Sequence, residues 1–149
     1  MGKRDKGRIP ADRNAPNPGK NPRTAISDPD RSQDKPTWRV RRAVLDGPFG
    51  WNRATEAENL FVRSKLGEFE TMRWFELHDK QHHYLSWDSL SKDAQDDFKR
   101  RFRDEERETI FSFRLSNKQR VIGLRLSGVF EIIWWDPEHE FCPSEKKNT

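Results

Sequence analysis

With 149 residues, the chain has room for one domain. Charged residues make up 36% of it and hydrophobic residues only 32%, and no apolar run approaches the length that a membrane-spanning helix needs. The basic N-terminus lacks the apolar core of a secretory signal, and a single cysteine allows no internal disulfide. These features exclude a membrane protein and a disulfide scaffold, and they lead us to expect a cytoplasmic protein.

The first 36 residues differ from the rest in composition. Residues 1–35 contain nine basic and five acidic residues, whereas the remainder contains 20 of each, so the net charge of +4 belongs to the N-terminal segment. All six Trp and all ten Phe lie from Trp38 onward. Residues 1–36 therefore cannot bury enough surface to offset the entropy of ordering, and we expect a disordered basic tail followed by one domain over 37–149. Such a tail either adds salt-sensitive attraction to nucleic acid or only raises solubility.

The first half of the domain predicts one strand and two to three helices. Residues 38–46 are rich in β-favouring side chains and run into the turn sequence DGPFG. Apolar side chains then recur with the period of a helix over 54–67, where a glycine can end it, and a second helical stretch follows over 68–78. Ser91 is a typical N-cap, which predicts a third helix over 92–103.

The last third of the chain predicts a three-stranded antiparallel meander. Residues 109–115 alternate between apolar and polar, 120–126 form a second predicted strand, and the run 129–135 is apolar on both faces, as in a central strand. Short turn sequences join these runs. We therefore predict an α+β fold in which the helices pack on one face of the sheet and leave the other face open.

Several common catalytic motifs are absent from the sequence. It has no glycine-rich phosphate loop, no CxxC pair, no HExxH and no GxSxG. His78 and His82 have the i, i+4 spacing of two metal ligands on one helix face, but the helix is predicted to end there, which favours solvated loop histidines. We therefore predict no metal and no cofactor. His83 remains a candidate proton shuttle near neutral pH.

Basic side chains are dense from the third helix into the meander. On an open sheet face they would bind a phosphate backbone and stabilise the charge that develops during phosphodiester cleavage. The alternative is that they pair with the many nearby carboxylates. The cations concerned are Arg100, Arg101, Arg103, Arg107, Arg114, Lys118, Arg120 and Arg125.

The segment WWDPEH follows the last predicted turn and ends in a histidine. Strand alternation puts Trp134 and Trp135 on opposite faces, so one could stack on a base if both are not used in the core. His139 lies close in sequence to Asp136 and Glu138, which makes it a candidate acid or base oriented by a carboxylate. The alternative is an exposed histidine near the C-terminus.

The order of strand, helices and meander, with arginines on the meander and a histidine after the last strand, resembles the RelE/YoeB/ParE toxin superfamily. Its members are small bacterial ribonucleases or gyrase poisons that antitoxins bind. The resemblance implies that Arg120 stabilises the phosphorane, that His139 is the general acid and that Glu108 matches an acidic residue before the meander. The chain departs from the family because Glu140, and not a tyrosine, follows His139. The run 112–143 also resembles small bacterial proteins that end in WWDPxH, and that resemblance implies no activity.

These observations lead to one principal prediction and two alternatives. We expect a toxin-like, metal-independent endoribonuclease with RNA or the ribosome and an antitoxin as partners, whose Arg120 and His139 converge in one cleft. The alternatives are a non-catalytic module that binds nucleic acid or protein, and a protein interface built on exposed aromatic residues. The predicted catalytic residues are Arg120, His139, Arg114 and Glu108, and the predicted nucleic-acid contacts are Lys118, Arg125, Arg101 and Trp135.

Overall fold

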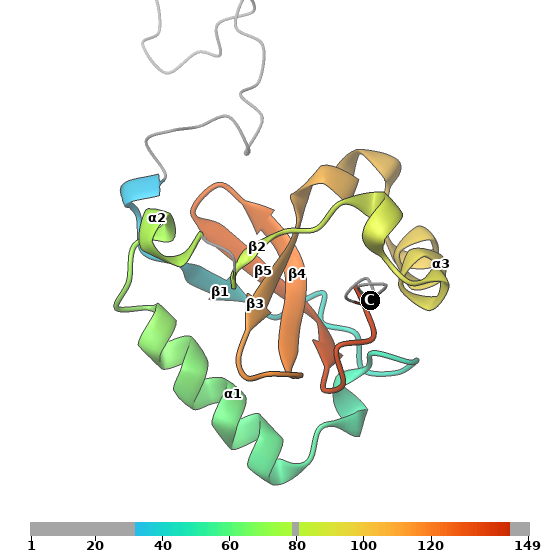
Figure 1. The fold of residues 1–149 in the computed structure, drawn as a ribbon, viewed down its shortest axis with the longest axis horizontal. Coiled ribbons are helices and arrows are strands. Elements are labelled where there is room, and N and C mark those ends of the chain that lie inside the picture. The colour runs from blue at the N-terminus through green and yellow to red at the C-terminus, as the bar shows by residue number, and fades with distance from the viewer. Residues whose placement is uncertain (1–31, 79–80, 144–149) are drawn as a thin grey trace, which may run out of the picture.

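A computed structural model describes residues 32–78 and 81–143, and it has the predicted α+β class. The chain forms five strands and three α-helices (Figure 1), with short 3₁₀ helices at Trp51–Arg53, Trp87–Ser89 and Asp104–Thr109. Across the described residues, no helix has the length and apolar character needed to cross a membrane. The elements in chain order are β1 (Thr37–Arg39), α1 (Glu56–Phe69), α2 (Trp74–Leu77), β2 (His83–Tyr84), α3 (Lys92–Arg101), β3 (Ile110–Arg114), β4 (Arg120–Leu126) and β5 (Val129–Asp136).

The five strands form one sheet in the order β1-β5-β4-β3-β2. Strands β3, β4 and β5 make the predicted antiparallel meander. β1 pairs with β5 in parallel, and β2 adds an antiparallel edge beside β3. β5 therefore has neighbours on both sides, in keeping with its apolar sequence, while β4 occupies the middle of the sheet.

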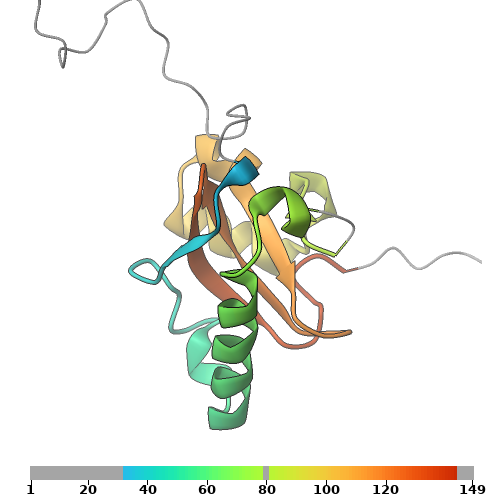
Figure 2. The same ribbon diagram turned by 90° about the vertical axis from the view of Figure 1, so that its left-hand side faces the viewer.

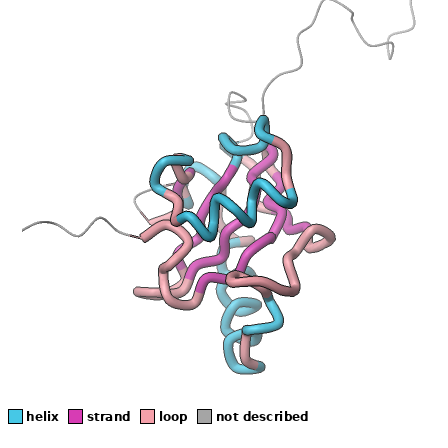
Figure 3. The backbone as a smooth tube through the Cα atoms, turned by 90° about the vertical axis from the view of Figure 1, so that its right-hand side faces the viewer, coloured by secondary structure: helices cyan, strands magenta, loops and turns pink. Residues whose placement is uncertain are grey.

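Helices cover both faces of the sheet, so the prediction that they pack on one face is wrong. Helix α3 packs on one side, which we call the α3 face, and α1 with α2 packs on the other, the α1/α2 face (Figures 1 and 2). Seen from the opposite side, α3 crosses in front of the strands (Figure 3). The physical reason is that successive strand residues are apolar on both faces, as in Ile110 and Phe111, and each face must be covered.

The capping residues Thr55 and Ser91 mark where α1 and α3 begin, whereas Gly67 does not mark where α1 ends. Thr55 caps α1, because its hydroxyl accepts the Glu58 N–H at 3.1 Å while Glu58 Oε1 accepts the Thr55 N–H at 3.0 Å. Gly67 does not end α1, which runs on to Phe69 and leaves only the single turn of α2 within the predicted second helix. The predicted cap at Ser91 is confirmed, since its side chain accepts the Ala94 N–H at 3.2 Å.

The first predicted strand is much shorter than its sequence suggests. Only Thr37–Arg39 joins the sheet, as β1, and the chain then turns away through exposed residues that include Val40 and Leu45. Val44 returns to the α3-face core, where its N–H donates to Ile133 O at 2.8 Å. The segment thus links β1 to the core without extending the sheet.

A β-bulge between β4 and β5 changes which face the end of β5 presents. Pairing shifts at Ile122/Gly123, and a Cβ at position 123 would overlap the main-chain oxygen of Glu131, so this close approach requires glycine. Before the bulge, Ile132 lies on the α1/α2 face, whereas Trp134 lies on the α3 face. Because alternation continues from Trp134, Asp136 lies on the α3 face as well.

Candidate active site

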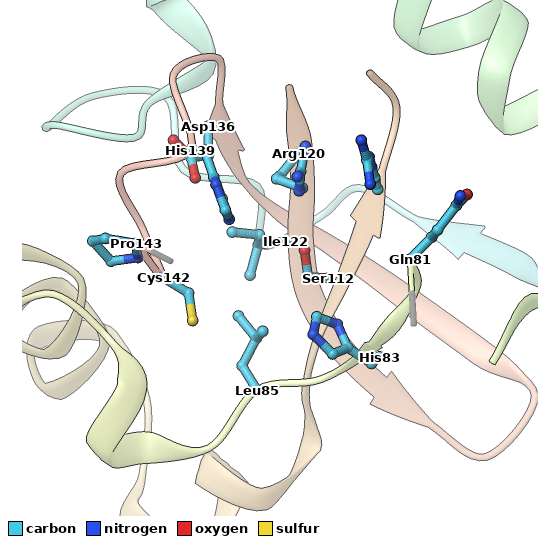
Figure 4. Close-up of a pocket in the computed structure, with 11 residues that line it drawn as sticks. Gln81, His83, Leu85, Ser112, Arg120, Ile122, Asp136, His139, Cys142 and Pro143 are labelled. Carbon is cyan, nitrogen blue, oxygen red and sulfur yellow. The ribbon is translucent and has the colours of Figure 1, made fainter. Parts of the chain in front are cut away.

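A cleft of about 300 Å³ opens on the α3 face, over strands β2 to β5. Its volume is at the lower end of the range for sites that bind small molecules, roughly 300–1,000 Å³. Figure 4 shows the side chains converging on an apolar floor that includes Ile122 and Leu85. The cleft is lined by Gln81, His83, Leu85, Ser112, Arg114, Arg120, Ile122, Asp136, His139, Cys142 and Pro143.

Sheet register explains why residues so far apart in sequence share this cleft. Arg114 pairs with Arg120 across β3 and β4, and Arg120 pairs with Asp136 across β4 and β5, so these three form one row. A second row, two residues away, runs through Ser112 and Ile122. Directly opposite residues in a sheet point to the same face, and so do residues two apart along a strand. The register therefore places the two arginines and the aspartate together.

The turn between β3 and β4 holds both arginines. Arg120 Nη1 donates to Ser116 O at 2.6 Å and Gln119 O at 3.0 Å, and its Nη2 donates to Asn117 O at 3.2 Å. Arg114 Nε donates to the same Ser116 O at 3.3 Å, and its Nη2 donates to Asn117 Oδ1 at 3.0 Å. These neutral acceptors orient the guanidinium groups without cancelling their charge.

Neither of these two arginines is neutralised by a carboxylate in the described part of the chain, where no ion pair within 4.0 Å includes either. Burial lowers the pKa of the Arg120 guanidinium, and the positive charge of Arg114 lowers it further. An arginine remains protonated in proteins, so the cleft carries an excess of positive charge, because its two guanidinium groups outnumber the single carboxylate, Asp136, that lines it. Such a site attracts an anion.

Asp136 shapes the loop that carries His139. Its side chain is 1% exposed, and its two oxygens accept the N–H groups of Glu140 at 2.9 Å and Phe141 at 3.0 Å. His139 itself has φ +58°, a left-handed conformation that is uncommon outside glycine. Both hydrogen bonds return the chain toward the end of β5, which turns His139 over the cleft (Figure 4).

Two histidines reach the cleft from opposite sides (Figure 4). His139 follows β5 and is partly buried, and burial lowers its pKa, an effect that the charge of Arg120 strengthens. His83 lies on the edge strand β2, is exposed, and pairs in register with Ser112. The neutral form of His139 therefore predominates near pH 7.

The structure brings together three of the four predicted catalytic residues, Arg114, Arg120 and His139. The prediction that Glu108 belongs to this site is wrong. Glu108 lies exposed in the 3₁₀ helix before β3, whereas Arg114 is at the end of that strand. Glu108 does not line the cleft, and the five residues of β3, about 14 Å, separate it from Arg114. Its match to an acidic residue of the toxin family rested on sequence order alone.

The predicted nucleic-acid contacts do not line the cleft. Trp135 is fully buried and stacks on Trp51 on the α1/α2 face, so it cannot stack on a base. Arg125 is 9% exposed and covers the ring of Trp74 at 4.0 Å. Arg101 pairs with Asp97 at 3.0 Å, and Lys118 is exposed and pairs with Glu138 at 3.5 Å, so neither lines the cleft, and their contact with nucleic acid stays a prediction.

Sequence reasoning missed three further groups in the cleft. Ser112 was assigned only to a strand, and Asp136 was considered only as a neighbour that could orient His139. Cys142 also lines the cleft, and its Sγ donates to Ser89 Oγ at 3.2 Å. The alternation of 109–115 could have placed Ser112 beside Arg114. Gly123 within a predicted strand is a signal for a bulge, but it does not say that the bulge brings Asp136 to this face.

Within residues 32–78 and 81–143, no group of three or more His, Cys, Asp and Glu side chains is arranged to hold a metal ion. Comparisons of the chain with protein-family models, with curated proteins and with solved structures each give no match. The resemblance to the toxin superfamily therefore stays a prediction that rests on the order of the elements and on the residues of the cleft.

Proposed function

We propose that this cleft binds a phosphodiester group of RNA and cleaves it without a metal ion, as a toxin-like endoribonuclease does. The observation that carries the proposal is the convergence of Arg114, Arg120 and His139 on one cleft, with neither arginine paired to a carboxylate in the described chain. Fixed cations suit a phosphate both in the ground state and as its charge grows in the transition state. A histidine beside them supplies proton transfer near neutral pH.

The chemistry favours RNA over DNA as the substrate. The proposed cleavage uses no metal-activated water, so the nucleophile comes from the substrate, and the 2′-hydroxyl group is present only in RNA. RNA is then bound either free or on the ribosome, in the cytoplasm. A toxin of this kind also needs an antitoxin protein that restrains it.

The test is cleavage of RNA by the purified full-length protein in the presence of a chelator. We expect cleavage by the wild type and a loss of at least about 100-fold for Arg120→Ala and for His139→Ala, the usual range for removing one transition-state donor or one general acid–base group. The matched control is Arg63→Ala, because Arg63 is exposed on α1, which packs on the other face. Induced expression in a bacterium should arrest growth only for active versions.

A non-catalytic binding module is the second candidate. It is favoured by the three main-chain carbonyls that fix Arg120, since a rigid guanidinium is sufficient for binding an anion. This candidate predicts that RNA binds without being cleaved, that Arg120→Ala weakens binding, and that His139→Ala leaves it unchanged. Absence of cleavage by the wild type overturns the nuclease proposal.

A further inference from the structure

We propose that His83 and His139 act as a general acid and base pair on opposite sides of one phosphodiester. His139 is the base, which reverses the role that the toxin resemblance implies for it, and His83 is the acid. The inference rests on the proposed function, because it assigns a second catalytic residue to the same cleft. It also fixes the products, which are one fragment ending in a 2′,3′-cyclic phosphate and one beginning with a 5′-hydroxyl.

The sheet places the two imidazoles across the cleft from each other. His83 lies on β2 and His139 directly follows β5, and only β3 and β4 separate these strands. Three strand spacings amount to about 14 Å between backbones, and the two side chains reach inward across part of that span. Figure 4 shows Ile122 and Ser112 between them, with Arg120 at the rim of the same opening.

This arrangement meets the geometric demand of an in-line displacement. The attacking and leaving oxygens lie on opposite sides of phosphorus, so a base and an acid must approach from opposite sides as well. Arg114 and Arg120 lie side by side in the sheet register and can take the non-bridging oxygens. The charge of His83 is also near enough to lower the pKa of His139.

The surroundings of the two histidines assign their roles. The groups that face His139 are Arg120, Asp136, Arg114 and His83, and Cys142 lines the cleft beside it. Burial and the two arginines lower the pKa of His139, against a smaller opposing effect of Asp136, so it is neutral and ready to accept a proton. His83 lies on β2, on the opposite side of the cleft, so it is the group placed to protonate the leaving oxygen.

The proposed step balances without a cofactor. A ring nitrogen of His139 takes the proton of the 2′-hydroxyl, and the 2′-oxygen forms a bond to phosphorus. The bond between phosphorus and the 5′-oxygen breaks, and that oxygen takes a proton from His83. His139 ends protonated and His83 neutral, no atom changes oxidation state, and proton exchange with water restores both.

The test compares two dinucleotide substrates, one natural and one with sulfur in place of the bridging 5′-oxygen. A thiolate leaves without being protonated, so the sulfur substrate does not need the acid. On the natural substrate we expect His83→Gln and His139→Gln each to lose at least about 100-fold in kcat. On the sulfur substrate His83→Gln should return to within about 10-fold of the wild type, and His139→Gln should not. The control is His78→Gln, since His78 is exposed and does not line the cleft.

The pH dependence of kcat gives a second reading. The wild type should show a bell-shaped profile. His83→Gln should lose the fall at high pH, and His139→Gln should lose the fall at low pH. If either histidine had a purely structural role, its replacement would lower kcat but keep both the fall at low pH and the fall at high pH.

The possible failures can be told apart. Cleavage of the natural substrate by His83→Gln at the wild-type rate overturns the role of His83 and leaves the proposed function intact. If His139→Gln cleaves the sulfur substrate at a rate near that of the wild type, the assignment of acid and base is overturned. Cleavage of neither substrate by the wild type overturns the proposed function itself. Circular dichroism of each variant shows whether it is folded, and exposed His83 should tolerate the change.

Discussion

The arginines of the cleft and those at the end of α3 have opposite surroundings. Arg114 and Arg120 donate to main-chain carbonyls and to one asparagine, and neither forms an ion pair with a carboxylate in the described chain. Arg100 and Arg101 both pair with Asp97, at 2.7 and 3.0 Å. Both sets come from parts of the chain that are rich in basic residues. The comparison shows that the acceptor opposite each arginine, more than the density of arginines, separates a candidate anion site from a structural ion pair.

Asp97 offers the largest test of this comparison. Its side chain is 1% exposed and also accepts the Trp134 Nε1–H at 2.7 Å, so it connects α3 to β5. Asp97→Ala leaves the buried Trp134 Nε1–H without its acceptor and removes charge-assisted hydrogen bonds to two arginines that stay in contact with solvent, so we expect it to lower the free energy of unfolding by about 2–3 kcal/mol. Urea denaturation measures it.

The control for Asp97 is Asp104, whose side chain is 80% exposed and pairs with Arg107 at 2.8 Å. Exposed ion pairs contribute about 0–1 kcal/mol, so Asp104→Ala should change stability by less than about 1 kcal/mol. An equally small change in Asp97→Ala would show that the arginines at the end of α3 are not held by a structural ion pair, and the contrast with the cleft would fail.

Anion binding is the next test, with an intermediate effect. A ligand that binds only the folded state adds about 2.7 kcal/mol at 100 times its Kd, so phosphate at high concentration should raise Tm by several degrees. We expect this rise in the wild type and in Arg101→Ala, and its loss in Arg114→Ala and Arg120→Ala. Differential scanning calorimetry in phosphate, against sodium chloride of equal ionic strength, measures the shift. Equal shifts in all four proteins would place the anion elsewhere.

Much of the fold could be predicted because it depends on local patterns. Alternation over 109–115 identified β3, the apolar run 120–126 between two turn sequences identified β4, and the hydroxyl of Ser91 identified the start of α3. The convergence of Arg120 and His139 was also predictable, since antiparallel pairing brings the start of β4 to the end of β5. These features require only the nearest neighbours in sequence or the adjacent strand.

What the sequence did not reveal depends on contacts between distant elements. An apolar helix face predicts burial but does not say which face of the sheet receives it, so the division between α1 and α3 was missed. Trp135 is a residue type that suits either a core or a base-stacking site, and only its packing on Trp51 decides for the core. Gly123 within a strand suggests a bulge, but its partner, the Glu131 main chain, and the change of face that follows depend on the neighbouring strand.

The smallest expected effect is on the titration of His139. Burial lowers its pKa in the folded protein, and the charge of Arg120 adds to that effect. The unfolded chain, with a pKa near 6.5, therefore binds a proton more readily than the folded protein. Below that pH the free energy of unfolding should decrease as pH falls through the folded pKa, and His139→Gln should remove this part of the pH dependence.

The same histidine can report on the comparison of the two sets of arginines. Arg120→Ala removes a positive charge beside His139 and should raise the pKa of its imidazole, measured by NMR from the ring proton shifts against pH. Arg101→Ala should leave the pKa of His139 unchanged, because Arg101 is paired with Asp97 and does not line the cleft. Equal pKa values of His139 in the wild type and in Arg120→Ala would mean that the charge of Arg120 is already screened in the cleft. The cleft would then have no more attraction for a phosphate than the ion-paired surface of α3.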